Sequence, residues 1–197
     1  IQAAAGRTAT TALGAAADLA RGLRLQGEDL RRLVRVSPAK RLVVFCVDSS
    51  SSMGLEARMA SVKGCVEALL ERAYQSRDQV ALVAFAGQAA TVVLRPTSSI
   101  EVAKTRLASL PTGGRTPLAS GLTSAFELAR TARSGQTPVI VLLSDGRATA
   151  ADGNRDPYQA ALEVAERIAA SRIAGLVVDT ESGPRRLGLA HRLAAAM

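Results

Sequence analysis

The sequence predicts an α/β fold with a mainly parallel sheet, one antiparallel edge strand and helices on both faces. Continuous apolar runs, typical of central strands covered on both sides, alternate with segments of helical periodicity. The short turn Ala86–Gly87–Gln88 joins two strands and makes that pair antiparallel. Hydrophobic residues make up 48% of the 197 residues, and aromatic residues only 3%, so Ala, Val, Leu and Ile must fill the core.

Five strands are expected. RLVVFCV, TPVIVLLSDG and IAGLVVDT are apolar over most of their length and predict three buried strands. QVALVAF and ATVVLR flank the short turn and predict the antiparallel pair. In chain order the predicted strands are residues 41–47, 79–85, 90–95, 137–146 and 173–180.

Helices are expected between these strands. In the first of them, six apolar residues recur at helical spacing: Leu55, Met59, Val62, Val66, Leu69 and Ala73. Ser98 or Ser99, Pro117 and Asp156 suit the first positions of three later helices. The predicted helices are residues 55–75, 98–110, 117–133 and 156–171, with a last one from about 185 to the end.

Residues 1–40 are expected to form a basic arm or linker from a preceding domain, and residues 41–197 the domain itself. Residues 1–41 hold eight Lys and Arg against three acids, and Ser37–Pro38 breaks the chain before the first strand. Because the chain opens on Ile, we expect it to be part of a longer protein.

Composition narrows the classes of partner and location. No apolar run reaches the length of a membrane span, so no membrane-spanning segment is expected. The net charge of +8 favours an acidic partner, and the lack of aromatic residues among the basic ones favours protein over nucleic acid. Cys46 and Cys65 read as small buried residues, which indicates a reducing, cytoplasmic setting.

Acidic and hydroxyl side chains follow the predicted strands. Asp48 and residues 49–52, all serines, follow the first strand, Asp145 follows the fourth, and Thr116 closes a glycine-rich loop. The carboxyl ends of parallel strands meet at one sheet edge, so we expect these groups to converge. Carboxylate and hydroxyl oxygens suit a hard divalent cation such as Mg²⁺, whereas zinc and copper are disfavoured.

Other interpretations of the same residues stay open. Asp48 could cap the following helix, and Asp145 could close a turn. Asp48 could also be the nucleophile of a magnesium-dependent phosphotransferase, although positions 49–52 offer only hydroxyls. No P-loop motif exists for a nucleotide, and a catalytic triad would need His191, the one histidine, which reads as a helix-surface residue.

The pattern resembles the metal-ion-dependent adhesion site of von Willebrand factor A domains, whose sheet is Rossmann-like and doubly wound. The Asp-x-Ser-x-Ser motif reads Asp48-Ser49-Ser50-Ser51-Ser52, followed by Thr116 in TGGRTP and Asp145 in LLSDGR. The resemblance implies that Ser50 and Ser52 bind the metal directly and Thr116 directly or through water. Asp48 and Asp145 would act mostly through bound water. The metal would be Mg²⁺, with Mn²⁺ or Ca²⁺ as substitutes, and its open position would take an Asp or Glu of a protein partner.

A closer resemblance is to the integrin-like domain of the magnesium chelatase D subunit. ARMASVKGCVEALLERAY, RDQVALVAFAG, LPTGGRTPLASGL and LVVDTE carry it. It implies a non-catalytic domain within an ATP-dependent chelatase complex, coupling an AAA+ ATPase subunit to the large tetrapyrrole-binding subunit. A stand-alone interaction module outside tetrapyrrole synthesis is the alternative.

Ser51, inside the motif, and two arginines near it bear on the expected metal site and its partner. The family usually has glycine where this chain has Ser51, and if that position needs a positive φ, Ser costs about 1 kcal/mol there. Arg115 and Arg147 flank the expected site. Their charges could steer an acidic partner to the metal, so both are candidate partner-binding residues.

Overall fold

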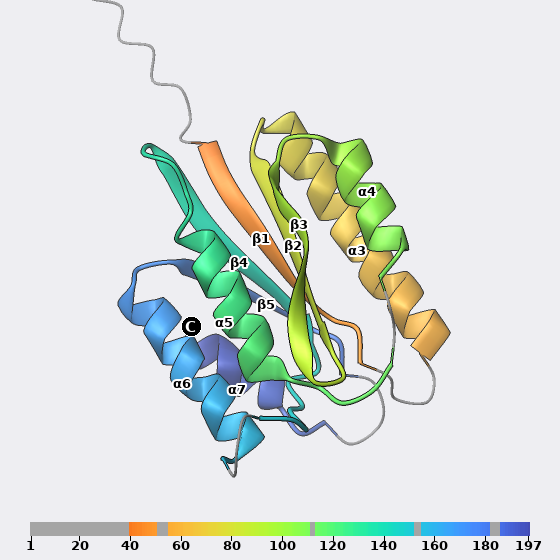
Figure 1. Cartoon of the computed structure of the whole chain (residues 1–197), viewed down its shortest axis with the longest axis vertical. Helices are drawn as coiled ribbons and strands as arrows, with labels where there is room; N and C mark the ends of the chain where they lie inside the picture. The colour runs from red at the N-terminus through yellow and green to blue at the C-terminus, as the bar shows by residue number, and fades with distance from the viewer. Residues whose placement is uncertain (1–39, 51–54, 111–112, 152–154, 182–185) are drawn as a thin grey trace, which may run out of the picture. The chain divides into compact units, whose positions relative to one another are not determined.

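The computed structural model describes residues 40–50, 55–110, 113–151, 155–181 and 186–197 (Figure 1). Within these ranges the side chains of residues 55–63, 65 and 100 are left out of the description. The predicted division at residue 40 coincides with the start of the described residues and stays a prediction.

Five strands form one mixed sheet in the order β3-β2-β1-β4-β5. Only β2 and β3 are antiparallel, and all other neighbouring pairs are parallel. The strands are β1 (Lys40–Asp48), β2 (Gln79–Ala86), β3 (Ala89–Thr97), β4 (Gln136–Ser144) and β5 (Ala174–Asp179). This arrangement confirms the predicted fold class, including the antiparallel edge strand.

Helices cover both faces of this sheet (Figure 1). One layer holds α3 (Leu55–Gln75) and α4 (Ile100–Ala108). The other holds α5 (Leu118–Ala129), α6 (Pro157–Ala170) and α7 (Leu189–Ala196). Two buried clusters, one on each side of the sheet, correspond to these layers.

Strand β1 supplies residues to both clusters. Val44 and Cys46 pack in the α5–α6–α7 layer, whereas Phe45 and Val47 pack on the opposite side. All four side chains are at most 1% exposed. The continuous apolar run at the start of the domain therefore predicted a central strand correctly, and Cys46 is buried as expected.

Two sequence predictions near the C-terminus need correction. Strand β5 was expected to be buried, but it ends the sheet order, and Leu176 is 50% exposed. An apolar strand sequence alone cannot distinguish a central strand from an edge strand. The last helix begins at Leu189 rather than near residue 185, because Gly188 adopts a left-handed φ of 65° immediately before it.

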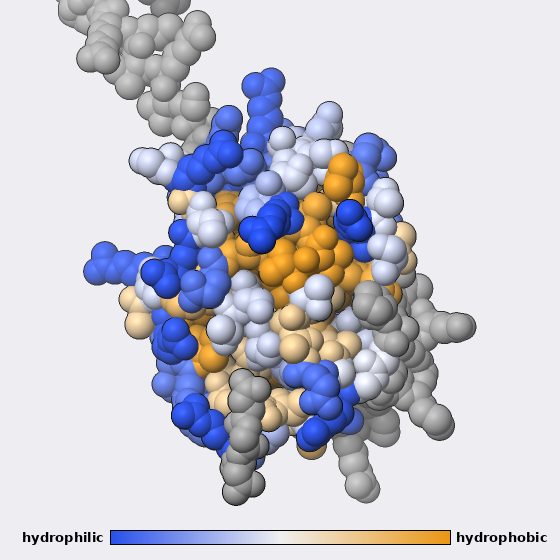
Figure 2. Space-filling view, in the orientation of Figure 1, coloured by the Kyte–Doolittle hydropathy of each residue, from blue (hydrophilic) through white to orange (hydrophobic). Residues whose placement is uncertain are grey.

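The surface seen in Figure 2 is mixed. Apolar side chains gather over the part of the sheet near β2 and β3, and hydrophilic side chains surround them (Figure 2). Val92, on the edge strand β3, is 41% exposed. Among the helices of the described ranges, none combines the length and apolar character needed to cross a membrane.

Candidate metal site at the carboxyl edge of the sheet

The candidate site lies where the order of the sheet reverses. The chain passes from β1 to β2 on one side and later returns to β4 on the other side of β1. In parallel α/β sheets this reversal leaves a crevice at the carboxyl ends of the two strands. Asp48 is the last residue of β1 and Ser144 the last residue of β4, so both side chains lie at this crevice.

Asp48 is the centre of a hydrogen-bond network at this edge. Its Oδ1 accepts from the backbone N of Ser50 at 3.0 Å and from Ser50 Oγ at 2.6 Å. Its Oδ2 accepts from Ser144 Oγ at 2.9 Å. Thr116 Oγ1 donates to Ser50 Oγ at 2.8 Å. Three segments that are far apart in the sequence thus place four polar side chains in one contiguous cluster.

Main-chain contacts hold the two loops that carry these side chains. Ser49 is buried, its N–H donates to Phe85 O, and its carbonyl accepts from Gly113 N at 2.9 Å. Gly114 has a φ of 88° and lies so close to the β2–β3 turn that a Cβ would come within 2.9 Å of Gly87 Cα. The glycine pair therefore lets the Thr116 loop pack against both β2 and the Ser49 loop.

Thr149 fixes Thr116 from the other side. Its Oγ1 accepts from Thr116 N at 2.7 Å, and its own N–H donates to Thr116 O at 3.0 Å. The Arg115 guanidinium also donates to Thr149 O, from Nε at 2.9 Å. Arg115 is exposed, and its hydrogen bond to Thr149 O helps to hold the Thr116 segment in place.

Asp145 occupies the turn after β4. Its Oδ1 accepts from Arg147 N at 3.0 Å, so it closes a turn, as one of the open interpretations held. The Arg147 guanidinium lies 3.6 Å from Asp145 Oδ2 and 3.9 Å from Glu181 Oε1. Arg147 therefore bridges two carboxylates at the sheet edge.

Asp48 and Glu181, two carboxylates at this edge, have opposite pKa shifts. Burial raises the pKa of Asp48 to about 6, and the nearby Asp145 carboxylate adds to the rise, against the lowering by hydrogen bonds from Ser50 and Ser144. The pKa of Glu181 is instead lowered, chiefly by the hydrogen bond from Leu187 N, with help from Gly188 N and Arg147. Asp48 thus lacks a full counter-charge from the described residues.

The donor set at Asp48 fits a small hard cation. Mg²⁺ is bound by oxygen ligands and usually keeps several of its waters. Ser50 Oγ lies 2.6 Å from Asp48 Oδ1 and 2.8 Å from Thr116 Oγ1, so two hydroxyl oxygens and one carboxylate oxygen are grouped at this point. Across the described ranges no three His, Cys, Asp or Glu side chains gather, which disfavours a zinc-type site.

The structure brings together most of the predicted site residues. Asp48, Ser50 and Thr116 are linked by hydrogen bonds, and Asp145 lies near enough to raise the pKa of Asp48. Ser52 and the unusual Ser51 lie outside the described residues. Their assignment as ligand and spacer stays a prediction.

Three contributors were not assigned roles from the sequence. Ser144 links Asp48 to Gly146 N, Thr149 holds Thr116, and Glu181 anchors Arg147. Ser144 directly precedes Asp145 at a strand end, which is a signal that could have been used. Glu181 follows the last predicted strand, so its place at this edge could be expected from the sequence, although it matches no ligand position. Thr149 carries no such local signal, because its contacts with Thr116 depend on how separate loops meet.

Comparisons with known proteins identify the family of this fold. A family model described as the von Willebrand factor type A domain matches residues 43–148. The chain belongs to the von Willebrand factor type A domain family. The SpRpn10 VWA domain shares this fold, with a TM-score of 0.55 and 12% identity, over 79% of this chain and 82% of that one.

Several relatives of this von Willebrand A domain are larger proteins. An uncharacterized protein of Mycobacterium tuberculosis is 43% identical over 87% of this chain and 27% of its own length. The magnesium-chelatase 60 kDa subunit of Rhodobacter capsulatus is 43% identical over 83% of this chain and 30% of its own length. This chain therefore spans less than a third of either relative.

A further relative is shorter. An uncharacterized protein of Methanocaldococcus jannaschii is 34% identical over 66% of this chain and 75% of its own length. The same von Willebrand A domain thus occurs both in large proteins and as most of a small one.

Proposed function

We propose that this von Willebrand A domain is a Mg²⁺-dependent protein-interaction module that does no chemistry of its own. The observation that carries the proposal is the contact chain from Asp48 through Ser50 to Thr116, at the sheet's reversal point, around a carboxylate with a raised pKa. Buried carboxylates without a full counter-charge are suited to holding a cation.

In this proposal each residue has a defined task. Ser50, Ser52 and Thr116 offer hydroxyl oxygens to the metal. Asp48 and Asp145 supply negative charge, mostly through bound water. When bound, Mg²⁺ supplies a positive charge that can exchange water for an Asp or Glu of a partner.

We further propose that the module works in a magnesium-chelatase-like protein. The 43% identity to a subunit named as magnesium chelatase supports this context. There the domain would couple an AAA+ ATPase subunit to the large tetrapyrrole-binding subunit. The carboxylate-to-metal contact would then be the link between motor and substrate-binding subunit.

A pull-down with purified ATPase and large chelatase subunits tests the proposal. We expect the wild-type chain to retain a partner with Mg²⁺ and to lose it with a chelator. Asp48→Ala should lose the partner in both conditions. Asp179→Ala is the matched control, since Asp179 also ends a parallel strand and accepts from the N–H two residues on, yet is exposed at the end of β5.

Partner retention that ignores both chelator and Asp48→Ala would refute the metal-anchor role. If neither chelatase subunit binds but a carboxylate-bearing protein is retained with Mg²⁺ alone, the stand-alone module is favoured. The Methanocaldococcus jannaschii relative, most of which this domain matches, is the observation behind that second candidate. Phosphoryl transfer is less well supported, because positions 49–52 beside Asp48 offer only hydroxyls and no second carboxylate.

A further inference from the structure

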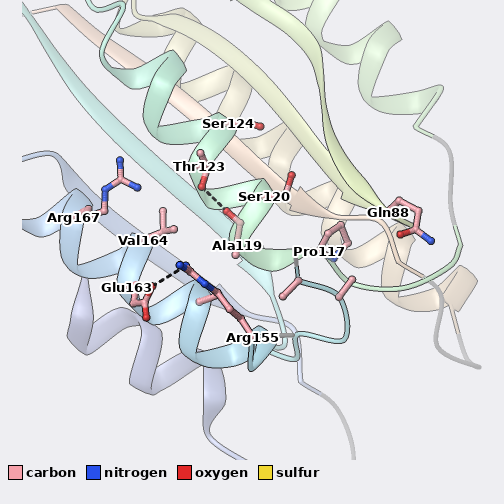
Figure 3. Close-up of a pocket in the computed structure, with 13 residues that line it drawn as sticks. Gln88, Pro117, Ala119, Ser120, Thr123, Ser124, Arg155, Glu163, Val164 and Arg167 are labelled. Atoms are coloured by element: carbon pink, nitrogen blue, oxygen red, sulfur yellow. Dashed lines mark hydrogen bonds and ion pairs between the residues drawn. The ribbon is translucent and has the colours of Figure 1, made fainter. Parts of the chain in front are cut away.

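A groove of about 340 Å³ runs between α5 and α6 (Figure 3). Pro117, Ser120 and Ser124 line it from the α5 side, and Arg155, Glu163 and Arg167 line it from the α6 side. We call it the α5–α6 groove. In Figure 3 Arg155 and Glu163 lie together on the α6 side, with Arg167 further along α6, while the Ser120 and Ser124 oxygens lie on the side of α5 away from α6.

The groove begins beside the candidate metal site. Pro117 lines the groove and directly follows Thr116, whose hydroxyl belongs to the site. Ala150 also lines the groove, and its N–H donates to Thr116 O at 3.3 Å. The Thr116–Pro117 segment and the Thr149–Ala150 segment thus border both the candidate metal site and the groove.

The length of the groove suits a short extended peptide. Along α5 the lining residues run from Pro117 to Ser124, which at 1.5 Å per residue is about 10 Å. On α6 they run from Ala160 to Arg167, the same number of residues. An extended chain advances about 3.3–3.6 Å per residue, so about three residues of a partner span the groove.

The charges of the groove favour an acidic occupant. Arg155 Nη1 lies 3.6 Å from Glu163 Oε2, and these side chains are 74% and 54% exposed. Arg167 rests over the Phe126 ring at 5.6 Å and has no ion pair among the described residues, so its charge is available. Two guanidinium groups and one carboxylate therefore line this side of the groove.

The α5 wall adds hydrogen-bonding capacity. Ser120 Oγ accepts from Ala90 N at 3.0 Å, which leaves its own hydrogen to donate. Ser124 lines the groove one turn further along the helix. Donors thus outnumber carboxylates on both walls, the pattern expected for a partner with negatively charged side chains.

We propose that the α5–α6 groove binds a short acidic segment of the same partner whose Asp or Glu occupies the metal. The inference rests on the proposed function for its anchor, but the groove supplies a separate and testable contribution. The metal site provides the fixed point, and the groove selects partners that carry further acidic residues beside it.

Two fluorescein-labelled peptides test the inference by anisotropy on the full 197-residue chain with Mg²⁺ at physiological ionic strength. One peptide has a central Asp flanked on each side by a pair of Gly and then a pair of Glu. The other has Gln in place of Glu. We expect the Glu peptide to bind about three- to tenfold more tightly, as a few exposed charge pairs allow.

Variants of the groove should change the affinity ratio, which is the affinity for the Glu peptide divided by that for the Gln peptide, in opposite directions. Arg155→Ala and Arg167→Ala should bring it toward one, whereas Glu163→Gln should raise it by removing the groove's carboxylate. Arg106→Ala is the matched control, because this exposed arginine lies on α4 across the sheet, and its ratio should equal that of the wild type. Thermal unfolding of each variant checks that the domain stays folded.

The outcomes separate the two proposals. Equal affinity for both peptides, or a ratio unchanged by the Arg155 and Arg167 variants, overturns the groove proposal and leaves the metal anchor standing. If the Gln peptide binds equally well in chelator and to Asp48→Ala, the metal anchor itself fails. Absence of binding by either peptide overturns the groove proposal as well.

Discussion

Asp48 and Glu181 are two shielded carboxylates at the same edge of the sheet, and their surroundings differ. Glu181 follows the edge strand β5 and accepts from two main-chain N–H groups, Leu187 and Gly188, while Arg147 lies nearby. Asp48 ends the central strand β1 and accepts from two hydroxyls and one N–H, with Asp145 nearby. The pKa of Glu181 is accordingly lowered and that of Asp48 raised.

The difference distinguishes a carboxylate that organises the fold from one that serves a site. Glu181 holds the turn before α7, and its charge is matched by protein groups. Asp48 has hydroxyl donors that can rotate and turn their oxygens toward a cation, and a charge that the described residues do not fully match. The predictions below test this contrast, beginning with the largest expected effect.

Gly146 lies between Ser144, which contacts Asp48, and helix α7, which follows the Glu181 turn. Of the substitutions considered, one at Gly146 should lower the free energy of unfolding the most. A Cβ there would lie 2.4 Å from Ala190 N and 2.6 Å from Leu189 C, and its φ is 79°. We expect Gly146→Ala to lower the free energy of unfolding by about 2–4 kcal/mol in urea denaturation, through the clash with backbone and the strained φ. Gly135→Ala is the control: its φ of 82° is similar but its space is open, so about 1 kcal/mol is expected.

If both glycine variants lose the same free energy, the close packing of α7 on the Asp145 loop has no energetic weight. The surroundings of Asp48 and those of Glu181 would then not be coupled energetically through Gly146.

The pH dependence of Asp48 should give the next largest effect. Its pKa rises from an ordinary 3.8 to about 6 on folding, so the protonated form is favoured in the folded state. The stability that this form provides is present below the unfolded pKa and is lost as pH rises through about 6. In chelator, we expect this to remove up to about 3 kcal/mol of unfolding free energy in the wild type, and Asp48→Asn to escape this loss.

Urea denaturation in chelator across this pH range compares the two proteins directly. Parallel curves for wild type and Asp48→Asn would mean that the Asp48 charge is compensated by the protein after all.

Ser144 connects Asp48 to the loop that follows β4, and its substitution should have a smaller effect on stability. Its fully buried hydroxyl donates to Asp48 Oδ2 and accepts from Gly146 N at 3.1 Å. Ser144→Ala should cost about 1–2 kcal/mol of unfolding free energy, because Gly146 N loses its acceptor. Loss of the donor should also raise the pKa of Asp48, which NMR titration of its carboxyl carbon can measure; an unchanged pKa would contradict this role.

Glu181→Gln should give the smallest loss, because the amide oxygen can still accept from Leu187 N. The pKa of Glu181 is lowered on folding, so its stabilising contribution is present above the ordinary glutamate pKa and is lost as pH falls through the folded value. The variant should therefore lose stability at neutral pH and show a shallower acid limb in thermal unfolding. A steeper acid limb would contradict this assignment.

Much of the fold was predictable because its signals are local. The apolar runs of β1 and β4, the helical spacing in α3 and the short β2–β3 turn each depend on neighbouring residues. The site residues Asp48, Thr116 and Asp145 could be placed at this edge because each follows a strand or precedes a helix there, whereas Ser50 was singled out among four serines by the resemblance to the family motif. The parallel topology then brings such positions together.

What could not be predicted depends on contacts between distant segments. The exposure of β5 follows from its place in the sheet order, which its own apolar sequence does not encode. Thr149 braces Thr116 from 33 residues away, and Ser120 caps the N–H of Ala90 from 30 residues away. Such pairs depend on the relative positions of loops and helices, which only the folded chain defines.

The central claim is that Asp48 holds a charge for a divalent cation, and a thermal unfolding titration with MgCl₂ at neutral pH tests it most directly. A ligand that binds only the folded state raises its Tm progressively with concentration. We predict such a rise for the wild type and for Asp179→Asn, and none beyond the effect of ionic strength for Asp48→Asn. Equal Tm shifts in all three proteins, or no shift in the wild type, would contradict the account.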